Sequence, residues 1–557
     1  MGRSVASREP GPVAWITAIL LPLFVASASP IVSAGQGTYL AKKRYEPRPL
    51  PAFATAKSKL PSPIFDEDPD TIKCYWKAWE LAFRNFHEPA QDSGFVSAFI
   101  DAAFNQNIFL WDTCFMTMFC NYAHPDVPGI CSLDNFYAKQ HEDGEICREI
   151  NRTTGLDFEQ WVNAKDEPLF SRWGYTLDTG QKRVSVVYEG RPVPTPNPKL
   201  TLDALNHPIF AWAELESLRL TGDKNRLRLV WEPLTRYYAA LQKHLQQGNG
   251  LYLTDWASMD NSTRNPYLEP GGTGIDISCE MVLFARNLAE MASILGKEAE
   301  AQQYRRDAEQ LSTLINRLMW DEQRGFYFDL TLKGERAPVR SIAAFWALLA
   351  KVASKSQAEA LAAELKNPET FNTPHRVPTL AANEPGFNPK GGYWKGAVWV
   401  PTDKMVVAGL ENYGYADLAR EIALNHLRNI VAVFRETGTI WENYAPQSIA
   451  HGEPAKGDFV GWTGLGPIAF FIEYAVGIRA DALADKVTWD VRSPRRVGVE
   501  RFWFAGKTVS LVCEEADATG TRAVTIQSTG SFHLTISWQG KTTTVQVPAG
   551  NEIQLRL

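Results

Sequence analysis

The chain has 557 residues, of which 45% are hydrophobic and 22% are charged, and its formal net charge at pH 7 is −6. This length suits one large domain and a smaller one, and the composition is ordinary for a globular protein. The small negative charge is not the excess of positive charge that attracts nucleic acid or an anionic membrane surface, so we expect neither as a partner.

Residues 1–34 have the features of a secretory signal peptide. Arg3 and Arg8 precede an apolar run, WITAILLPLFVA, and small residues follow it up to Ala34. The run is short for a membrane span but fits the hydrophobic region of a cleaved signal. We therefore expect an exported protein, periplasmic or extracellular, whose mature form begins near Gly35 and is not inserted in a membrane.

Residues 35–70 contain several prolines and many polar residues, which predicts an extended N-terminal arm. From Ile72 a helical period begins. The segment IKCYWKAWELAFRNF places four apolar residues on one helix face, namely Tyr75, Trp79, Ala82 and Phe86.

Further helical patterns follow as far as about residue 482, and several adjoin as pairs separated by a Gly or Asn break. About twelve helices in antiparallel pairs indicate a ring of helical hairpins over residues 71–482. Such a ring gathers its long loops at one mouth, where ligand sites belong. The patterns begin near Trp111, Gly129, Asp203, Lys224, Gly274, Ala299, Arg340, Gln357, Ala397, Tyr415 and Gly461.

After about residue 483 the hydrophobic period changes from helical to two. FHLTISW alternates apolar and polar residues, a Gln539-Gly540 turn follows, and KTTTVQV begins at once. This pattern is typical of a β-hairpin. Residues 483–557 are therefore expected to form a small β-sandwich-like domain that carries no catalytic residue.

Cysteine and histidine spacing argues against a metal site. The chain has no CxxC or HExxH motif and its nine histidines show no ligand spacing, so we expect no metal and no cofactor. Four of the seven cysteines crowd one region and could pair in an oxidising compartment, with the pairing left open. These are Cys114, Cys120, Cys131 and Cys147.

Two predicted loops carry acids beside aromatic residues. The first is DWASMDNSTRNP, residues 255–266, where Asp255 and Asp260 flank Trp256. The second is GTIWENYAPQS, residues 438–448, which contains Glu442. A turn with a packed Trp would explain the first loop, but a carboxyl group in a sugar-binding pocket would explain it as well.

Five phrases together resemble the trehalase-like and mannosylglycerate-hydrolase-like glycosidases, including glycoside hydrolase family 63. They are FLWDTCF at 109, SMDNSTR at 258, YWKGAVWVPTD at 393, IWENYAP at 440 and VGWTGLGPIAFF at 460. The resemblance covers roughly residues 72–480 and implies a mainly α catalytic domain folded as an (α/α)6 barrel. The phrases are specific to the superfamily but not to one substrate.

The resemblance also implies the catalytic pair. Asp260 stands where the family has its general acid, and Glu442 stands where it has its general base. An inverting glycosidase needs one protonated carboxyl and one ionised carboxylate on opposite sides of the bond. Asp255 is then a turn carboxylate rather than the acid, and Asp276 either faces the pocket or caps the start of a helix.

Substrate-binding residues are implied in the same way. Trp111 and Asp112 match the family pair in which an indole stacks on a sugar and a carboxylate grips its hydroxyls. Arg148 either anchors substrate or holds a catalytic carboxylate, and Lys395 replaces a common Arg, which weakens a bidentate grip. The phrases NQNIFLWD and QHEDGEICREI also differ from those of true trehalases, so trehalose is not the first substrate we expect. Core packing is the alternative for each tryptophan. The remaining candidates are Trp256, Trp394, Trp399 and Trp462.

These observations predict an exported glycoside hydrolase that cleaves an α-linked oligosaccharide or glycoside by an inverting two-carboxylate mechanism. One alternative is a polysaccharide lyase on a helical toroid, with His207 or Tyr444 as the base. Another is a non-catalytic glycan-binding protein, which would keep the tryptophans but would not need two facing acids. The sugar, the linkage and the oligomeric state stay open.

Overall fold

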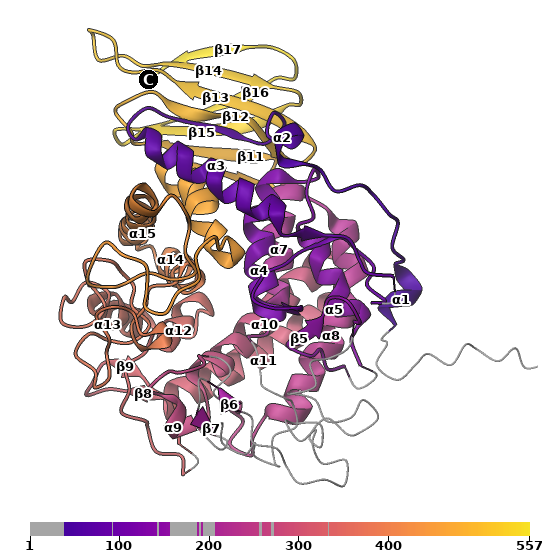
Figure 1. Cartoon of the computed structure of the whole chain (residues 1–557), viewed down its shortest axis with the longest axis vertical. Helices are drawn as coiled ribbons and strands as arrows, with labels where there is room; N and C mark the ends of the chain where they lie inside the picture. The colour runs from indigo at the N-terminus through magenta and orange to yellow at the C-terminus, as the bar shows by residue number, and fades with distance from the viewer. Residues whose placement is uncertain are drawn as a thin grey trace, which may run out of the picture. The chain divides into compact units, whose positions relative to one another are not determined.

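The structure is a computed structural model that describes residues 38–557 except 92, 142–143, 156–186, 189–190, 193–206, 255–258, 269–271 and 332. The expected signal peptide and the candidates Asp255 and Trp256 therefore lie outside the described residues. The described part is mainly helical with a C-terminal sheet region (Figure 1). Within it, no helix combines the length and the apolar character that a membrane crossing needs.

The first long helix, α3 (Pro69–Arg84), begins before Ile72 and ends before Phe86, but it buries the other three residues of the predicted face. Asp68 caps it by accepting a hydrogen bond from the backbone N–H of Asp70, and Pro69 occupies the first turn, where its missing N–H has no cost. Tyr75 and Trp79 are fully buried on the predicted face.

Six inner helical segments contact one another in chain order, and the last contacts the first, so that their contacts form a closed cycle. In α4 all residues are buried, as expected for a helix that is covered on every side. The six are α4 (Leu110–Cys120), α7 (Phe210–Thr221), α10 (Ile275–Ile294), α12 (Trp346–Leu349), α14 (Val400–Asn412) and η6 (Gly461–Leu465), which continues into the π-helix η7 (Gly466–Val476).

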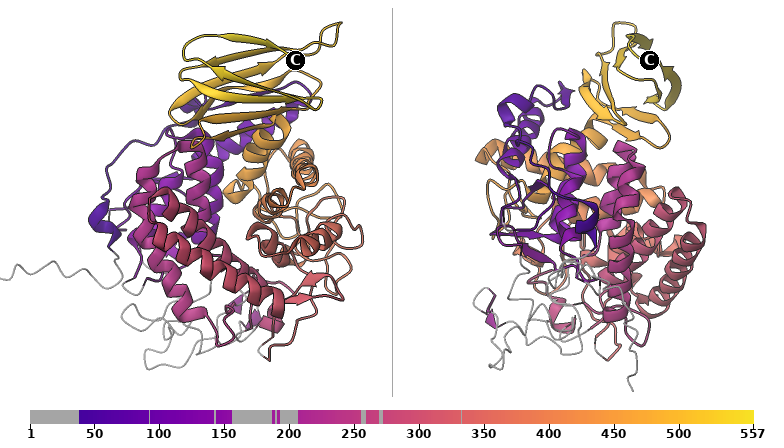
Figure 2. Two further views of the ribbon diagram at one scale, coloured as in Figure 1. Left: turned by 180° about the vertical axis from the view of Figure 1, so that it is seen from behind. Right: turned by 90° about the vertical axis from the view of Figure 1, so that its right-hand side faces the viewer.

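Amphipathic helices cover this inner set. α8 (Lys224–Leu245) packs on α7 and α10, α11 (Glu298–Leu318) packs on α10, and α15 (Ala416–Thr437) packs on α14 (Figure 2). Each buries an apolar stripe and leaves a charged face toward solvent. Shorter helical segments are α1 (Tyr39–Lys42), α2 (Phe53–Ala56), α5 (Asp134–Ala138), α9 (Asn265–Leu268), α13 (Lys355–Glu364), η1 (Asn121–Ala123), η2 (Ile130–Leu133), η4 (Ile342–Phe345) and η5 (Tyr393–Lys395).

Two of the expected helices are much shorter than the pattern suggested. The stretch from Arg340 forms only η4 and the single turn of α12, because Lys351 takes a left-handed conformation and Ser354 then caps the next helix with a capping box. The stretch from Gly129 forms only η2 and α5. All seven cysteines lie in described residues and carry free thiols.

The C-terminal region contains two sheets, and Phe504 of one meets Phe532 of the other with ring centroids 5.4 Å apart. One sheet has the order β1-β12-β13-β14-β17 and the other the order β10-β11-β15-β16, in which β11 and β15 are parallel. The strands are β1 (Ser62–Phe65), β10 (Ile478–Asp481), β11 (Lys486–Val491), β12 (Val497–Phe504), β13 (Lys507–Cys513), β14 (Ala523–Ser528), β15 (Phe532–Trp538), β16 (Lys541–Val547) and β17 (Ile553–Arg556).

The predicted hairpin is confirmed. β15 and β16 pair antiparallel up to Trp538 and Lys541, and both turn residues have positive φ, 47° at Gln539 and 77° at Gly540. Residues of the N-terminal arm also belong to this region, since β1 pairs with β12 from Ser62 opposite Glu500. Small two-stranded sheets join β2 (Phe86–His87) to β3 (Phe99–Ile100), β4 (Asn107–Phe109) to β5 (Glu149–Asn151), β6 (Val187–Tyr188) to β7 (Arg191–Pro192) and β8 (Trp320–Asp321) to β9 (Phe326–Tyr327).

Candidate active site

The start of α4 brings three of the predicted substrate-binding residues together. Strand β4 leads into α4 and pairs with β5, so Leu110 donates its N–H to the carbonyl of Arg148 at 2.9 Å. Trp111 and Asp112 follow in the first turn of α4. The short sheet therefore fixes Arg148 beside the two residues that the sequence singled out.

Asp112 is a buried carboxyl group with an unused acceptor. Its side chain is 2% exposed, and Oδ1 has no hydrogen-bond partner among the described residues. Burial raises the pKa of this carboxyl well above its usual range, the charges of Glu149 and Asp260 raise it further, and Arg148 opposes the rise. Arg148 itself is paired with Glu149. Asp112 therefore has an acceptor oxygen that no described protein group uses.

A second segment presents Asp260. The side-chain amide of Asn265 donates to the carbonyl oxygens of Met259 and Asp260, at 2.9 and 3.0 Å. Arg264 is fully buried and pairs with both Asp276 and Asp329. These contacts fold residues 259–268 into a compact loop in which the Asp260 side chain is partly exposed.

Asp276 therefore belongs to the support of this loop. It lies in the first turn of α10, where it bonds Arg264 and accepts from the N–H of Ile277 at 2.9 Å. Of the two roles the sequence allowed, the structure places it at the helix start, and the charge of Arg264 keeps its pKa below the usual range against the effect of burial.

Asn261 joins the Asp260 loop to a third segment, Gly391–Gly396. Its amide nitrogen donates to the carbonyl of Gly392 at 3.1 Å, and its oxygen accepts from the N–H of Trp394 at 2.9 Å. Between those two residues stands Tyr393, whose φ of 64° is unusual for a bulky side chain. The bonds from both of its neighbours hold this conformation in place.

Glu442 is connected to the Gly391–Gly396 segment through Tyr393. It is 5% exposed, and it accepts hydrogen bonds from the hydroxyl of Tyr393 at 2.9 Å and from the N–H of Lys456 at 3.1 Å. Burial raises the pKa of Glu442 to about 7. The two hydrogen bonds oppose this rise, and the negative charge of Asp260 adds to it. The charge of one predicted catalytic carboxyl thus acts on the pKa of the other.

Four of the predicted tryptophans form one aromatic cluster. Trp394 and Trp399 stack with centroids 4.4 Å apart, Trp462 lies 5.5 Å from Trp399, and Trp111 lies 5.3 Å from Trp462 and 5.9 Å from Trp394. Trp399 is fully buried, so it packs behind its neighbours rather than presenting a face to a ligand. Lys395 is partly exposed at the edge of the same segment.

The residues proposed for lyase chemistry are placed differently. Tyr444 is buried, and its hydroxyl accepts from the N–H of Trp441 at 3.2 Å, while burial raises its pKa far above the usual range. His207 is bonded to Glu280 through Nδ1 and packs against Trp111 at 4.1 Å. His207 thus helps to hold Trp111 in place.

Sequence reasoning missed the residues that support the two carboxyls. Tyr393, Asn261, Arg264 and Asp329 were not singled out, although all but Asp329 lie within or beside quoted phrases. The glycine pair Gly391-Gly392 before Tyr393 was the available signal, because consecutive glycines indicate left-handed backbone at a close approach.

Comparison with known structures shows first that the fold resembles that of a family 63 glycoside hydrolase. The crystal structure of a GH63 mannosylglycerate hydrolase from Thermus thermophilus in complex with glucose aligns with a TM-score of 0.52 and 19% identity, covering 71% of this chain and 99% of that one. At this identity the likeness concerns the fold alone.

The family follows from the sequence itself. The model of the mannosylglycerate hydrolase MGH1-like glycoside hydrolase domain matches residues 178–463, about half of the chain, and the protein belongs to this family of glycoside hydrolases. The match includes Asp260, Tyr393 and Glu442 and ends just after Trp462. This membership favours glycoside hydrolysis over the lyase and binding-protein alternatives.

Two relatives show how far the similarity extends. A mannosylglycerate hydrolase of Rubrobacter radiotolerans is 35% identical over 184 residues, which cover 32% of this chain and only 39% of that enzyme. An uncharacterized protein of Borreliella burgdorferi is 26% identical over 454 residues, which cover 78% of this chain and 86% of that protein.

Proposed function

We propose that this glycoside hydrolase inverts configuration, with Asp260 as general acid and Glu442 as general base. The observation that supports the proposal is the set of hydrogen bonds through Asn261 and Tyr393, which connect the loop of Asp260 to Glu442. The closed cycle of inner-helix contacts and the family resemblance together support an (α/α)6 barrel as its framework.

The chemistry requires one proton transfer on each side of the glycosidic bond, toward the leaving oxygen on one side and away from the attacking water on the other. Asp260 gives its proton to the leaving oxygen as the bond from that oxygen to the anomeric carbon breaks. A water molecule attacks the same carbon from the opposite face, and Glu442 takes the proton that this water loses. A base with a pKa of about 7 is stronger than an ordinary glutamate and is still largely ionised just above neutrality.

The remaining groups bind the sugar. Trp394 and Trp111 supply an apolar wall, and the unused oxygen of Asp112 accepts a hydrogen bond from a sugar hydroxyl. We propose a short α-linked glycoside as substrate. Relatives named mannosylglycerate hydrolase and probable mannosyl-oligosaccharide glucosidase make mannosylglycerate and glucosylated mannosyl-oligosaccharides the first compounds to assay.

The test is hydrolysis of a glycoside panel, followed by proton NMR of the first sugar released. We expect turnover of at least one α-linked member and initial release of the anomer opposite to that of the substrate. Retention of configuration would contradict the assigned mechanism. Formation of an unsaturated product that absorbs in the ultraviolet would restore the lyase alternative.

We also propose that the protein is exported. The proposal is supported by the Arg-flanked apolar run before Ala34. N-terminal sequencing of the protein from its native host should find a mature start near Gly35. A mature chain that keeps residues 15–26 would rule out cleavage at this point.

A further inference from the structure

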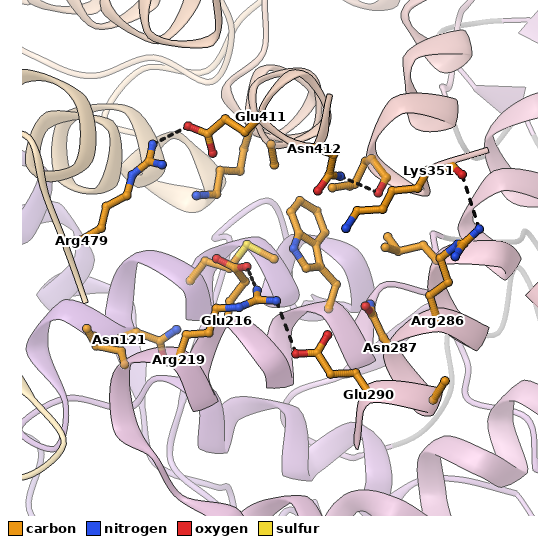
Figure 3. A pocket seen from close by; sticks show the side chains of 18 of the residues that line it. Asn121, Glu216, Arg219, Arg286, Asn287, Glu290, Lys351, Glu411, Asn412 and Arg479 are labelled. Carbon is orange, nitrogen blue, oxygen red and sulfur yellow. Dashed lines mark hydrogen bonds and ion pairs between the residues drawn. The ribbon is translucent and has the colours of Figure 1, made fainter. Parts of the chain in front are cut away.

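A cavity of about 850 Å³ lies at the C-terminal ends of several inner helices, opposite the helix starts of the candidate active site (Figure 3). The candidate active site uses residues at helix starts, such as Asp112 in the first turn of α4. The cavity is lined by residues at helix ends, such as Asn121 just beyond α4 and Asn412 at the end of α14. A cavity of this size matches small-molecule sites in general.

Buried polar groups without partners line this cavity. Oδ1 of Asn121, Nδ2 of Asn287 and Nε of Arg286 have no hydrogen-bond partner among the described residues. The side chains of Asn121 and Asn287 are only 4% and 8% exposed. An unpaired buried donor or acceptor carries a free-energy cost, which a ligand that completes the hydrogen bond removes.

Several charged side chains that line the cavity form ion pairs with oppositely charged neighbours. Lys404 is bound to Glu473 at 3.1 Å, and Arg479 is bound to Glu411 at 2.6 Å. Arg219 similarly meets Glu216 at 2.5 Å. These pairs leave little net charge for a ligand to meet.

Arg286 and Lys351 are the exceptions. Neither has a carboxylate within ion-pair distance in the described part of the chain; instead, a guanidinium nitrogen of Arg286 donates to the carbonyl of Lys351 at 3.4 Å. Figure 3 shows both of them, with Asn287, on the side of the cavity away from Asn121. Glu309, a lining carboxylate that also lacks an ion pair among the described residues, is solvent-exposed.

The two sides of the cavity thus differ in chemistry. One side offers two cations and an amide donor, and the other offers an amide acceptor. Cations near helix C-termini also offset the helix dipole, but that role does not account for unpartnered buried amides beside an open cavity. The buried Trp212 adds an aromatic surface to the lining.

We propose that this cavity binds a small hydroxylated organic anion, such as a sugar acid or a sugar phosphate. Lys351, Arg286 and Asn287 hold the acidic group, and Asn121 accepts a hydrogen bond from a hydroxyl. The proposal concerns a site separate from Asp260 and Glu442 and does not depend on their catalytic roles.

The test is isothermal titration of the full chain with four probes: glucose 6-phosphate, glucuronate, glucose and inorganic phosphate. Two variants probe the cavity. Lys351→Gln removes a charge from an exposed side chain, so the fold is not at risk, and Asn287→Leu removes the buried donor at nearly constant volume. Lys355→Gln is the matched control because Lys355 is exposed and does not line the cavity. Glu442→Gln separates the cavity from the candidate active site.

We expect at least one acidic sugar to bind wild type, Lys355→Gln and Glu442→Gln alike, and to bind Lys351→Gln about tenfold more weakly or worse. The stronger of the two acidic sugars identifies phosphate or carboxylate as the natural acidic group. The proposal is overturned if neither acidic sugar binds, if glucose binds as tightly, or if inorganic phosphate binds as tightly as glucose 6-phosphate. It is also overturned if Glu442→Gln, but not Lys351→Gln, abolishes binding.

Discussion

The hydroxyl of Tyr393 donates a hydrogen bond of 2.9 Å to Oε1 of Glu442, from a backbone position with φ of 64°. A left-handed conformation at a bulky residue costs about 1–3 kcal/mol. Asn261 bonds the residues on either side of Tyr393 and so stabilises this conformation. The strain is located where it sets the orientation and the titration of the proposed base.

This hydrogen bond predicts a shift in pH dependence. Glu442 must be ionised to act as base, so kcat/KM of the wild type should fall on the acid side with a midpoint near its pKa of about 7. Tyr393→Phe removes a bond that lowers this pKa, so the midpoint should move to higher pH. The measurement is kcat/KM across pH, with Tyr304→Phe on α11 as control. An unchanged or more acidic midpoint would contradict the role of Tyr393.

Asp112 should show opposite effects on stability and on binding. Its raised pKa means that the folded protein holds a proton that the unfolded chain releases above about pH 4. The stability of the wild type should therefore decline as pH rises above that value. Asp112→Asn should not show this decline, because asparagine does not ionise. At pH 7 the variant should be at least as stable as wild type, and the difference should shrink toward pH 4.

Asp112→Leu, which removes both side-chain oxygens, should weaken substrate binding, because the unused oxygen of Asp112 is assigned to a sugar hydroxyl. We expect KM to rise about tenfold or more. Urea unfolding at several pH values and steady-state kinetics check the two halves separately. Lower stability of Asp112→Asn at pH 7, together with an unchanged KM in Asp112→Leu, would show that Asp112 is a structural residue.

Arg264 should be important for stability although it lies in a loop. It is buried between Asp276 and Asp329, so Arg264→Met leaves two buried carboxylates without their cation. We expect a loss of about 3–5 kcal/mol in the free energy of unfolding, measured with urea. Arg305→Met, which breaks an exposed pair with Glu298, should cost no more than about 1 kcal/mol. Equal losses in the two variants would refute the argument.

The helices and the hairpin could be predicted because their signals are local. The apolar period from Ile72 to Ala82 and the turn at Gln539-Gly540 each lie within a short stretch of chain, and both features are present in the structure. The parallel pairing of β11 with β15 could not be predicted, since it joins strands separated by three others along the chain. The hydrophobic period of a strand and the residues of the turn that follows it contain no information on such pairings.

The same distinction applies to the site. The resemblance indicated Asp260 and Glu442, because each stands in a short phrase. The contact between Tyr393 and Glu442 spans 49 positions and that between Arg264 and Asp329 spans 65, so neither leaves a local pattern. Trp399 shows the converse: its phrase fits the family, but its full burial is a property of the packed aromatic cluster and not of the phrase.

The two proposed catalytic acids can be told apart by the leaving group. Asp260→Asn removes the proton donor, so kcat for a glycoside with a poor alcohol leaving group should fall by about 10²–10⁴. An aryl glycoside with an acidic phenol needs little protonation and should retain much of its rate.

Glu442→Gln removes the base that activates water, so kcat should fall by a similar factor for both kinds of substrate. The measurement is kcat for a series of aryl and alkyl glycosides in wild type and both variants, with circular dichroism as the control for folding. The raised pKa of Glu442 would equally suit an acid, so the result decides the assignment. If the rate of Glu442→Gln, rather than that of Asp260→Asn, recovered with acidic leaving groups, the two roles would be exchanged.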